Sequence, residues 1–197
     1  MRFAVLCLLA STLSPAPAPP DAPVFKVTPE DSTVTFSVKA SVAIVGKFEK
    51  WNATLAFPST DVTTGAMDIK IQADSVNTGS GMKDDKLRSK DFFNAEQDPT
   101  ITFHSDKIVQ TSPSTFELPG TFTIRGVSKP ETLTFTLADM ATARAKGEGE
   151  VKGTMAFDRK EFGMNSGIPF IKIADRVEVT VNLQAKRVSG PQLVFKQ

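Results

Sequence analysis

Apolar and polar residues alternate along much of this chain. Between Thr33 and Lys39 every second residue is apolar, and the residues between them are polar. A period of two places the apolar side chains on one face of an extended strand, so this segment is expected to be a half-buried β-strand. The same alternation appears in three later segments: Met67–Asp74, Thr132–Leu137 and Val177–Lys186.

Four further segments have strand character and are separated by turn-rich sequence. They are Lys47–Phe57, Thr100–Val109, Thr115–Arg125 and Gly149–Asp158. About eight strands with one apolar face each, joined mostly by short hairpins, favour an all-β fold in which an antiparallel sheet closes into a barrel without unpaired edges. A sandwich of two sheets is the structural alternative.

One of these strands changes parity along its length. Phe48 and Trp51 are both apolar, but an odd number of steps separates them. Both side chains face inward only if the strand contains a bulge, because a bulge shifts the alternation by one residue. The sequence therefore predicts a bulge near Glu49 or Lys50.

A short charged segment interrupts the strand pattern before the fourth expected strand. A helix is predicted from Met82 to Asp91, with Ser80 as a suitable N-cap. Asp84 and Asp85 stand in its first turn and basic residues follow, an order that complements the helix dipole. Pro99 separates this segment from the strand after it.

The first residues have the character of an export signal. A basic start is followed by an apolar run from Phe3 to Leu13, which is too short to span a bilayer, and then by small residues and prolines. Residues 1–22 are therefore interpreted as a signal peptide with a Pro/Ala-rich leader, residues 23–188 as the barrel domain and residues 189–197 as a tail. The mature protein is expected in the periplasm or outside the cell, with a lipid anchor on Cys7 as the less favoured alternative.

Charge and composition exclude several partners. The net charge is +1 and basic and acidic residues are interleaved, so the chain offers no basic field for a nucleic acid. No apolar run after residue 23 approaches the roughly 18 residues of a membrane helix, so no integral membrane segment is expected in the mature chain. A homodimer remains open.

Candidate catalytic and metal-binding residues are scarce. His104 is the sole histidine and is expected to face outward, while Cys7 is lost with the signal, so a zinc site or serine–histidine catalysis is disfavoured. Asp158 with Glu161 is a conceivable carboxylate pair of the glycoside-hydrolase kind, but turn and surface charge is the favoured interpretation. We expect a protein that is not an enzyme and holds no cofactor or metal.

Several ordered blocks resemble the bacterial YceI-like proteins. The blocks are Ser75-Val76-Asn77-Thr78, Lys83-Asp84, Leu87-Arg88-Ser89, Asp91-Phe92-Phe93, Asp98–Phe103, Gly120 with Phe122–Pro130, Asp158–Met164 and Asp175. The resemblance covers roughly Val24 to Arg187. It implies a lipocalin-like barrel whose apolar cavity binds a polyisoprenoid or similar long-chain amphiphile, such as a prenylated quinone, without covalent chemistry. Asp31 and Ala40 stand where many members have histidine, which leaves the head-group preference open.

The resemblance and the inward parity together nominate residues for the cavity. The candidates are Phe36, Val38, Phe48, Trp51, Ile69, Ile71, Phe92, Phe93, Phe103, Phe122, Phe135, Phe157, Arg159, Phe162 and Val179. Each phenylalanine serves equally well as packing, because a barrel of about eight strands can be filled by its own side chains. Arg159 either contacts a polar head group or, as the favoured interpretation, pairs with Asp175. Gly120 and Gly153 fall at inward positions, where a bend is favoured over space for a ligand.

A second class of function stays open. In this alternative the barrel is solidly packed and its loops, such as 77–81 and 165–170, dock a protein partner without any ligand. A filled interior with an exposed apolar patch at 167–170 would favour it.

Overall fold

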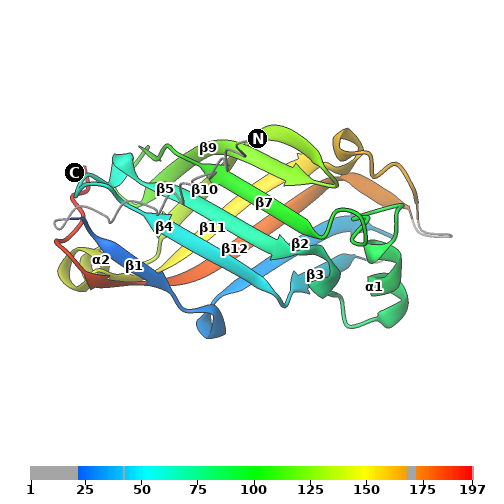
Figure 1. Cartoon of the computed structure of the whole chain (residues 1–197), viewed down its shortest axis with the longest axis horizontal. Coiled ribbons are helices and arrows are strands. Elements are labelled where there is room, and N and C mark those ends of the chain that lie inside the picture. The colour runs from blue at the N-terminus through cyan, green and yellow to red at the C-terminus, as the bar shows by residue number, and fades with distance from the viewer. Residues whose placement is uncertain (1–21, 42, 168–171, 197) are drawn as a thin grey trace, which may run out of the picture.

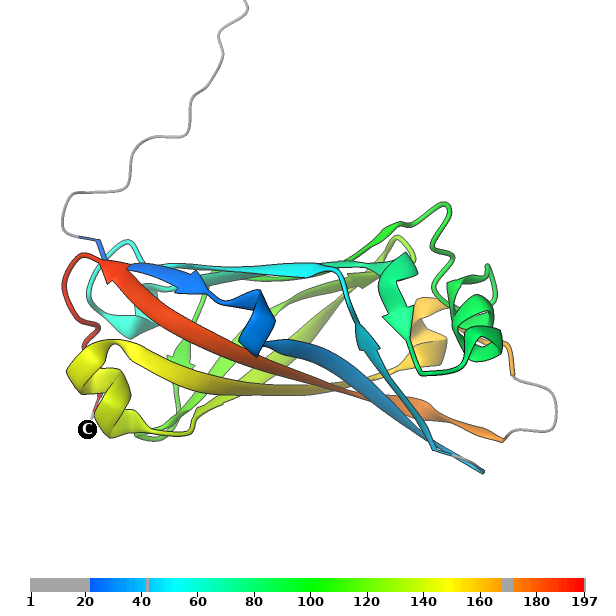
Figure 2. The same cartoon turned by 90° about the horizontal axis from the view of Figure 1, so that it is seen from below.

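The computed structural model describes residues 22–41, 43–167 and 172–196. Long strands run obliquely along the molecule and wrap into a barrel, with α1 (Gly81–Arg88) near one end and α2 (Met140–Lys146) at the other, as Figure 1 and the view from below in Figure 2 show. The two ends of the barrel are named the α1 end and the α2 end after these helices. The first and last described residues lie at the α2 end (Figure 1).

Within the described ranges, eight strands form a closed antiparallel ring. In order around the barrel they are β1 (Val24–Val27), β4 (Trp51–Ala56), β5 (Ala66–Gln72), β7 (Thr100–Ser105), β9 (Thr115–Ile124), β10 (Val127–Leu137), β11 (Glu148–Asp158) and β12 (Ile173–Ser189). Pairing of β1 with β12 closes the ring. The prediction of an all-β, eight-stranded antiparallel barrel is therefore confirmed, and a two-sheet sandwich is not what the chain forms.

The remaining strands extend or accompany this ring. They are β2 (Thr33–Ala40), β3 (Ile44–Phe48), β6 (Val76–Asn77) and β8 (Val109–Gln110). β1 and β2 both pair with the long strand β12, at different positions along its length. The 3₁₀ turn at Pro29–Asp31 separates β1 from β2. β3 and β4 are likewise consecutive parts of one barrel wall.

The parity change predicted a bulge near Glu49 or Lys50, and at these two residues the chain leaves the ladder and separates β3 from β4. Both residues leave the ladder and bond to Ser75: the Glu49 amide donates to its carbonyl at 3.1 Å and the Lys50 amide to its hydroxyl at 3.1 Å. Phe48 is buried and Trp51 half-buried on the inner side. The interruption thus turns both aromatic residues inward.

The predicted place of the helix, before the fourth strand, was wrong. α1 follows β6, because the chain forms β1 before the first expected strand, divides the second, and adds β6 at Val76–Asn77. The helix also ends at Arg88 instead of Asp91, and the Ser80 hydroxyl makes no capping hydrogen bond. These errors arise from short tertiary pairings that leave no periodic signal in the sequence.

The helix α2 was missed, although its ends carry recognisable signals. The Asp139 carboxylate accepts a hydrogen bond from the Thr142 amide at 3.0 Å, which caps the first turn. Gly147 closes the last turn in the left-handed region at φ 69°, as glycine commonly does. The seven residues between these signals include three alanines and a single strongly apolar side chain, Met140, so they show no amphipathic pattern.

Neighbouring groups occupy the space beside Gly120 and Gly153, so neither glycine leaves room for a ligand. The Phe135 ring covers Gly153 on the adjacent strand, so that a Cβ there would lie 2.5 Å from the ring. The His104 carbonyl and the Phe103 ring approach Gly120 from β7. Both glycines allow an aromatic ring to lie where a side chain would otherwise stand.

Candidate ligand-binding site

The barrel interior at the α1 end contains an apolar cavity of about 60 Å³. Side chains of inward parity come from β2, β3, β5, β7, β9, β11 and β12, while α1 adds Leu87 and the segment after it adds Phe92 and Phe93. The lining residues are Phe36, Val38, Ile44, Phe48, Ile71, Leu87, Phe92, Phe93, Ile101, Phe122, Ile124, Phe157, Arg159, Met164, Ile173, Val177 and Val179. Arg159 is the one charged residue among these described lining residues.

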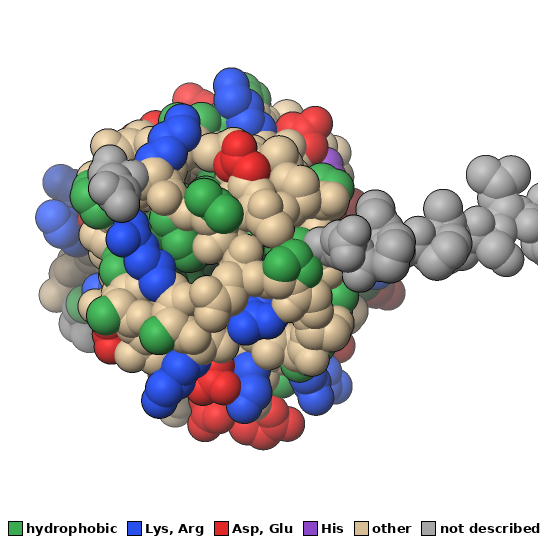
Figure 3. Space-filling view, turned by 90° about the vertical axis from the view of Figure 1, so that its left-hand side faces the viewer, with side chains coloured by type: hydrophobic (Ala, Val, Ile, Leu, Met, Phe, Trp, Pro, Cys, Tyr) green, Lys and Arg blue, Asp and Glu red, His purple; other side chains and the backbone are tan. Residues whose placement is uncertain are grey.

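A second apolar cavity of about 100 Å³ lies at the α2 end. Its walls come from β1, β4, β5, β9, β10, β11 and β12, and its roof comes from α2 and the tail. The lining residues are Phe25, Leu55, Phe57, Val62, Met67, Ile108, Phe116, Leu118, Phe135, Leu137, Ala143, Gly147, Glu148, Gly149, Val151, Leu183, Ala185, Leu193 and Phe195. Figure 3, which looks onto this end, shows apolar side chains in a central hollow with lysine and arginine side chains around it.

A layer of side chains separates the two cavities. On β5, for example, Met67 lines the α2-end cavity and Ile71 the α1-end cavity, while Ile69 between them lines neither. The same holds around the described barrel, and we call the residues involved the partition layer. Its members are Val34, Trp51, Ala53, Ile69, Phe103, Gly120, Leu133, Gly153, Met155 and Val181.

The structure brings ten of the fifteen predicted site residues together at the α1-end cavity. These are Phe36, Val38, Phe48, Ile71, Phe92, Phe93, Phe122, Phe157, Arg159 and Val179. Phe135 lines the α2-end cavity instead. Among the described lining residues the remaining four are absent from both cavities: Trp51, Ile69, Phe103 and Phe162.

Phe162 belongs to the barrel wall. β10 and β11 pair only from Thr134 to Leu137, so the two strands diverge toward the α1 end. Phe162 lies in the short helix that follows β11, is almost fully buried, and packs its ring against Phe122 and Phe157 at centroid distances of 5.5 and 5.2 Å. Its ring is therefore a structural support for two residues that do line the cavity.

Phe92 and Phe93 close the α1 end. The amide of Phe93 donates to the carbonyl of Leu87 at 2.9 Å, which turns the chain back over the helix. The Phe93 ring then meets the rings of Phe36 and Phe48 at centroid distances of 6.1 and 5.7 Å. Phe92 and Phe93 thus lie at one end of the barrel, as expected from the sequence. Both side chains line the cavity.

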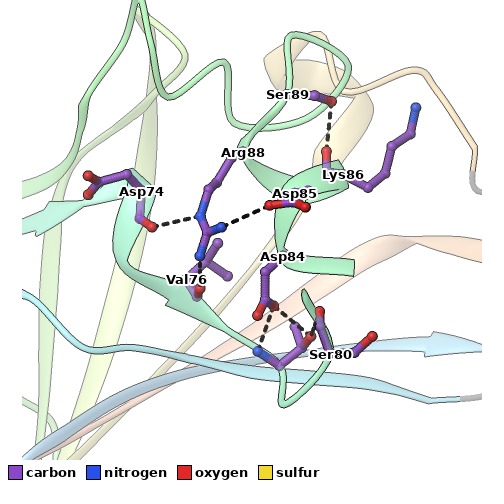
Figure 4. Close-up of polar contacts among 9 residues, drawn as sticks. Asp74, Val76, Ser80, Asp84, Asp85, Lys86, Arg88 and Ser89 are labelled. Atoms are coloured by element: carbon purple, nitrogen blue, oxygen red, sulfur yellow. Dashed lines mark hydrogen bonds and ion pairs between the residues drawn. The ribbon is translucent and has the colours of Figure 1, made fainter. Parts of the chain in front are cut away.

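Buried polar contacts hold the α1 segment in place (Figure 4). The Asp84 carboxylate is buried and accepts hydrogen bonds from the Thr78 amide and hydroxyl at 2.8 and 2.7 Å. Arg88 donates to the carbonyls of Asp74 and Val76 at 2.8 and 3.1 Å. The charged α1 segment thus fixes the end wall of the cavity through contacts within the protein.

Arg159 is also engaged by the protein itself. Its guanidinium is buried and donates to the carbonyls of Ala174 at 3.1 Å, Ser166 at 2.9 Å and Met164. It pairs with Asp175 at 3.2 Å. The ion pair favoured from the sequence is present, and four donated hydrogen bonds leave little capacity for a head group.

The pKa of Asp175 reflects this arrangement. A hydrogen bond from Lys160, together with the charges of Lys160 and Arg159, lowers the pKa of the Asp175 carboxyl below its usual range. Asp175 is therefore ionised at neutral pH and complements the buried guanidinium.

The α2 end is closed in another way. The tail crosses it by backbone contacts: the Val194 amide donates to the Thr60 carbonyl at 2.7 Å, and the Lys196 amide to the Gln110 side chain at 2.7 Å. Phe195 packs its half-buried ring against Phe116. All residues of α2 are at least partly exposed.

The candidate catalytic residues His104, Asp158 and Glu161 are absent from the described lining of both cavities. His104 is exposed and lies 2.7 Å from Asp68 on the neighbouring strand. Burial and the nearby Glu161 raise the pKa of Glu131, but Glu131 is absent from the described lining of both cavities. Within residues 22–41, 43–167 and 172–196, no group of three or more His, Cys, Asp or Glu side chains is placed to hold a metal.

The α2-end cavity was missed by sequence reasoning, except for Phe135. Leu55 and Phe57 share the parity of Trp51, and Val151 and Leu183 continue the alternation of their strands. This alternation was enough to predict that these side chains face the barrel interior. The roof at Leu193 and Phe195 comes from a tail with no periodic pattern, so only tertiary structure reveals it.

No helix in the described part of the chain is both long enough and apolar enough to cross a membrane.

Comparison with known proteins identifies a shared domain. The YceI-like domain family matches residues 25–185. A UPF0312 protein of Shewanella denitrificans is 26% identical over 130 residues, which cover 61% of this chain and 64% of that protein. A UPF0312 protein of Pseudomonas aeruginosa is 27% identical over 130 residues, covering 61% and 63%. The chain thus spans somewhat less than two thirds of the length of these curated relatives.

Solved structures share the fold. BcnA of Burkholderia cenocepacia superposes with a TM-score of 0.71 at 24% identity, covering 81% of this chain and 99% of that one. A YCEI protein of Campylobacter jejuni gives 0.60 at 25% identity, covering 74% and 86%. A polyisoprenoid binding domain from Saccharophagus degradans gives 0.63 at 13% identity, covering 84% and 99%.

Proposed function

The chain belongs to the YceI-like family, and from this membership we propose that its barrel binds a long-chain isoprenoid or similar amphiphile, such as a prenylated quinone. The ligand's apolar chain lies in the barrel interior, and the protein stores, transports or sequesters it without covalent chemistry. The proposal extends to this chain the ligand class named for the Saccharophagus degradans domain, which shares its fold.

The observation that carries the proposal is the apolar character of both cavities. Nearly all lining side chains are aliphatic or aromatic, and the buried Arg159 is already bonded to carbonyls and to Asp175. A ligand in such a space gains affinity from burying its chain, because few polar groups are free to select a head group.

Chain length alone supplies enough free energy. Burial of each CH₂ contributes about 0.8 kcal/mol, so a five-carbon isoprene unit contributes roughly 3 kcal/mol before the costs of binding. Micromolar affinity corresponds to about 8 kcal/mol, and association costs several kcal/mol more. A few buried units therefore suffice.

Native mass spectrometry of the purified protein tests the proposal. We expect a co-purified isoprenoid or, after lipid extraction, uptake of one prenyl quinone per chain in a titration. The matched control ligand is the same quinone without its prenyl tail, which is expected not to bind. Absence of any bound lipid and of any uptake by the extracted protein would contradict the proposal.

Export is a separate part of the proposal. Residues 1–21 lie outside the described residues, and the expectation rests on their basic, apolar and small-residue order. Fractionation of cells that produce the full chain, with N-terminal sequencing, tests it. The expected result is a periplasmic or secreted product that begins near residue 23, and a cytoplasmic product that retains Met1 would oppose it.

The packed barrel that docks a protein partner remains the second candidate. The partition layer favours it, because the middle of the barrel is filled by the chain's own side chains. The apolar patch that would support it is 167–170, of which 168–170 lie outside the described residues. Failure of lipid uptake, together with a stable complex with a protein partner, would select this candidate.

A further inference from the structure

We propose that Phe103 sets the length of apolar chain that the barrel accepts. This inference rests on the proposed function for the class of ligand and goes beyond it by naming the residue that limits the ligand's length. Phe103 is 4% exposed, and it is the largest buried side chain of the partition layer.

Phe103 stands between the linings of the two cavities. Its direct neighbours across the sheet are Ile69 on β5, which belongs to the partition layer, and Phe122 on β9, which lines the α1-end cavity. On its own strand, Ile101 lines the α1-end cavity two residues earlier. An apolar chain that fills either cavity and extends along the barrel therefore meets Phe103 before it reaches the other cavity.

Gly120 gives the Phe103 ring its position. On β9 this glycine lies between Leu118 of the α2-end lining and Phe122 of the α1-end lining. A Cβ at Gly120 would lie 2.8 Å from Phe103 Cζ, so the ring occupies the space that a side chain at 120 would fill. The ring therefore lies between the residues that line the two cavities.

The consequence is a limit on affinity. Each methylene that enters an apolar cavity tightens binding by about fourfold, because about 0.8 kcal/mol is gained per CH₂. Once the end of the ligand reaches Phe103, further carbons either remain in solvent or have to displace a close-packed ring. Affinity therefore rises with tail length and then levels off at the length set by Phe103.

A series of prenyl quinones of increasing tail length tests this inference by equilibrium titration. For the wild type we expect affinity to rise and then reach a plateau. In Phe103→Ala the two cavities join, and the plateau is expected to move to longer tails, with at least a tenfold gain for the first tail beyond the wild-type limit. Phe103→Leu removes less volume and is the second variant in case Phe103→Ala does not fold. It is expected to move the plateau in the same direction by a smaller amount.

A second substitution provides the matched control. Gly149 lines the α2-end cavity, and a Cβ there meets Leu137 Cδ2 at 3.4 Å and Ala143 Cβ at 3.8 Å, which is ordinary contact. Gly149→Leu is therefore expected to fill part of the α2-end cavity. Added to Phe103→Ala, it should return the plateau toward shorter tails, because the joined space then loses volume at the α2 end.

The outcomes separate the two proposals. A plateau at the same tail length in wild type and both Phe103 variants, with melting curves showing folded protein, overturns the role of Phe103 and leaves lipid binding intact. A wild-type affinity that keeps rising through the longest tails also overturns it. Failure of the wild type to bind any tail length removes the proposed function itself.

Discussion

The two ends of the barrel are closed by different kinds of interaction. At the α1 end, the buried Asp84 and Arg159 side chains hold loops and turns against the cavity through hydrogen bonds to backbone groups. At the α2 end, a short exposed helix and a tail cover a larger cavity by a few backbone bonds and the half-buried Leu193 and Phe195. We infer that opening the α2 end costs less free energy than opening the α1 end.

This difference indicates a route for the ligand. Buried charged groups are costly to leave without partners, so the α1 end opens only if several polar contacts are lost together. The tail at the α2 end separates from the barrel by losing a few exposed hydrogen bonds and one aromatic contact. We therefore expect exchange of apolar ligands to depend on the tail.

The largest expected effect is the loss of the buried guanidinium at the α1 end. Arg159→Met leaves the carbonyls of Ala174 and Ser166 without a donor, and we expect the free energy of unfolding to fall by about 3 kcal/mol. Urea denaturation measures the change. Lys160→Met is the control, because Lys160 contacts the same Asp175 from the surface and should cost less than about 1 kcal/mol.

Removal of the charge at Asp84 should come next. Asp84→Asn weakens acceptance from the Thr78 amide and hydroxyl, and we expect a loss of about 2 kcal/mol in the free energy of unfolding. Asp85→Asn is the matched control on the same helix, since Asp85 is largely exposed and its one ion pair among the described residues is with Arg88. Equal effects of the two substitutions would contradict a special anchoring role for Asp84.

A smaller change in stability is expected at the α2 end. Phe195→Ala removes the half-buried ring that packs on Phe116 and should cost about 1 kcal/mol. The same variant should take up and release a prenyl quinone faster than the wild type in stopped-flow measurements. Val194→Ala, at a neighbouring exposed position, is the control, and unchanged exchange rates in Phe195→Ala would mean that the tail does not cover the route.

The smallest effect is a pH dependence at the α1 end. Because its interactions with Lys160 and Arg159 lower the pKa of folded Asp175 below 3.8, its contribution to stability is present above about pH 4 and is lost as the pH falls through the folded value. The difference in denaturation midpoint between wild type and Asp175→Asn should therefore be constant above about pH 4 and shrink below it. A difference that grows on acidification would have the wrong sign.

Much of the barrel was predictable because its physical signal is repeated. Strict alternation at 33–39 and 177–186 marks strands with one buried face, and the parity change between Phe48 and Trp51 correctly located a break in the ladder. These signals depend only on neighbouring residues. Strand parity identified seven of the seventeen residues that line the α1-end cavity.

The features that were missed depend on contacts between distant segments. β1 and β6 are short and exist because β12 and β3 pair with them, and the tail becomes a roof only when Phe195 meets Phe116. The division of the interior was also hidden, since Ile69 and Phe103 have the same parity and character as residues that line a cavity. Only the three-dimensional register separates the partition layer from the walls.

The most direct measurement of the central claim is a crystal structure of the protein soaked or co-purified with a long-chain prenyl quinone. The account predicts electron density for the prenyl tail inside the barrel, in contact with Phe93 and Ile71 at the α1-end cavity or with Phe116 and Leu118 at the α2-end cavity. Both cavities unchanged and free of ligand, with the quinone on the outer surface or absent although a saturating concentration was present, would contradict the claim.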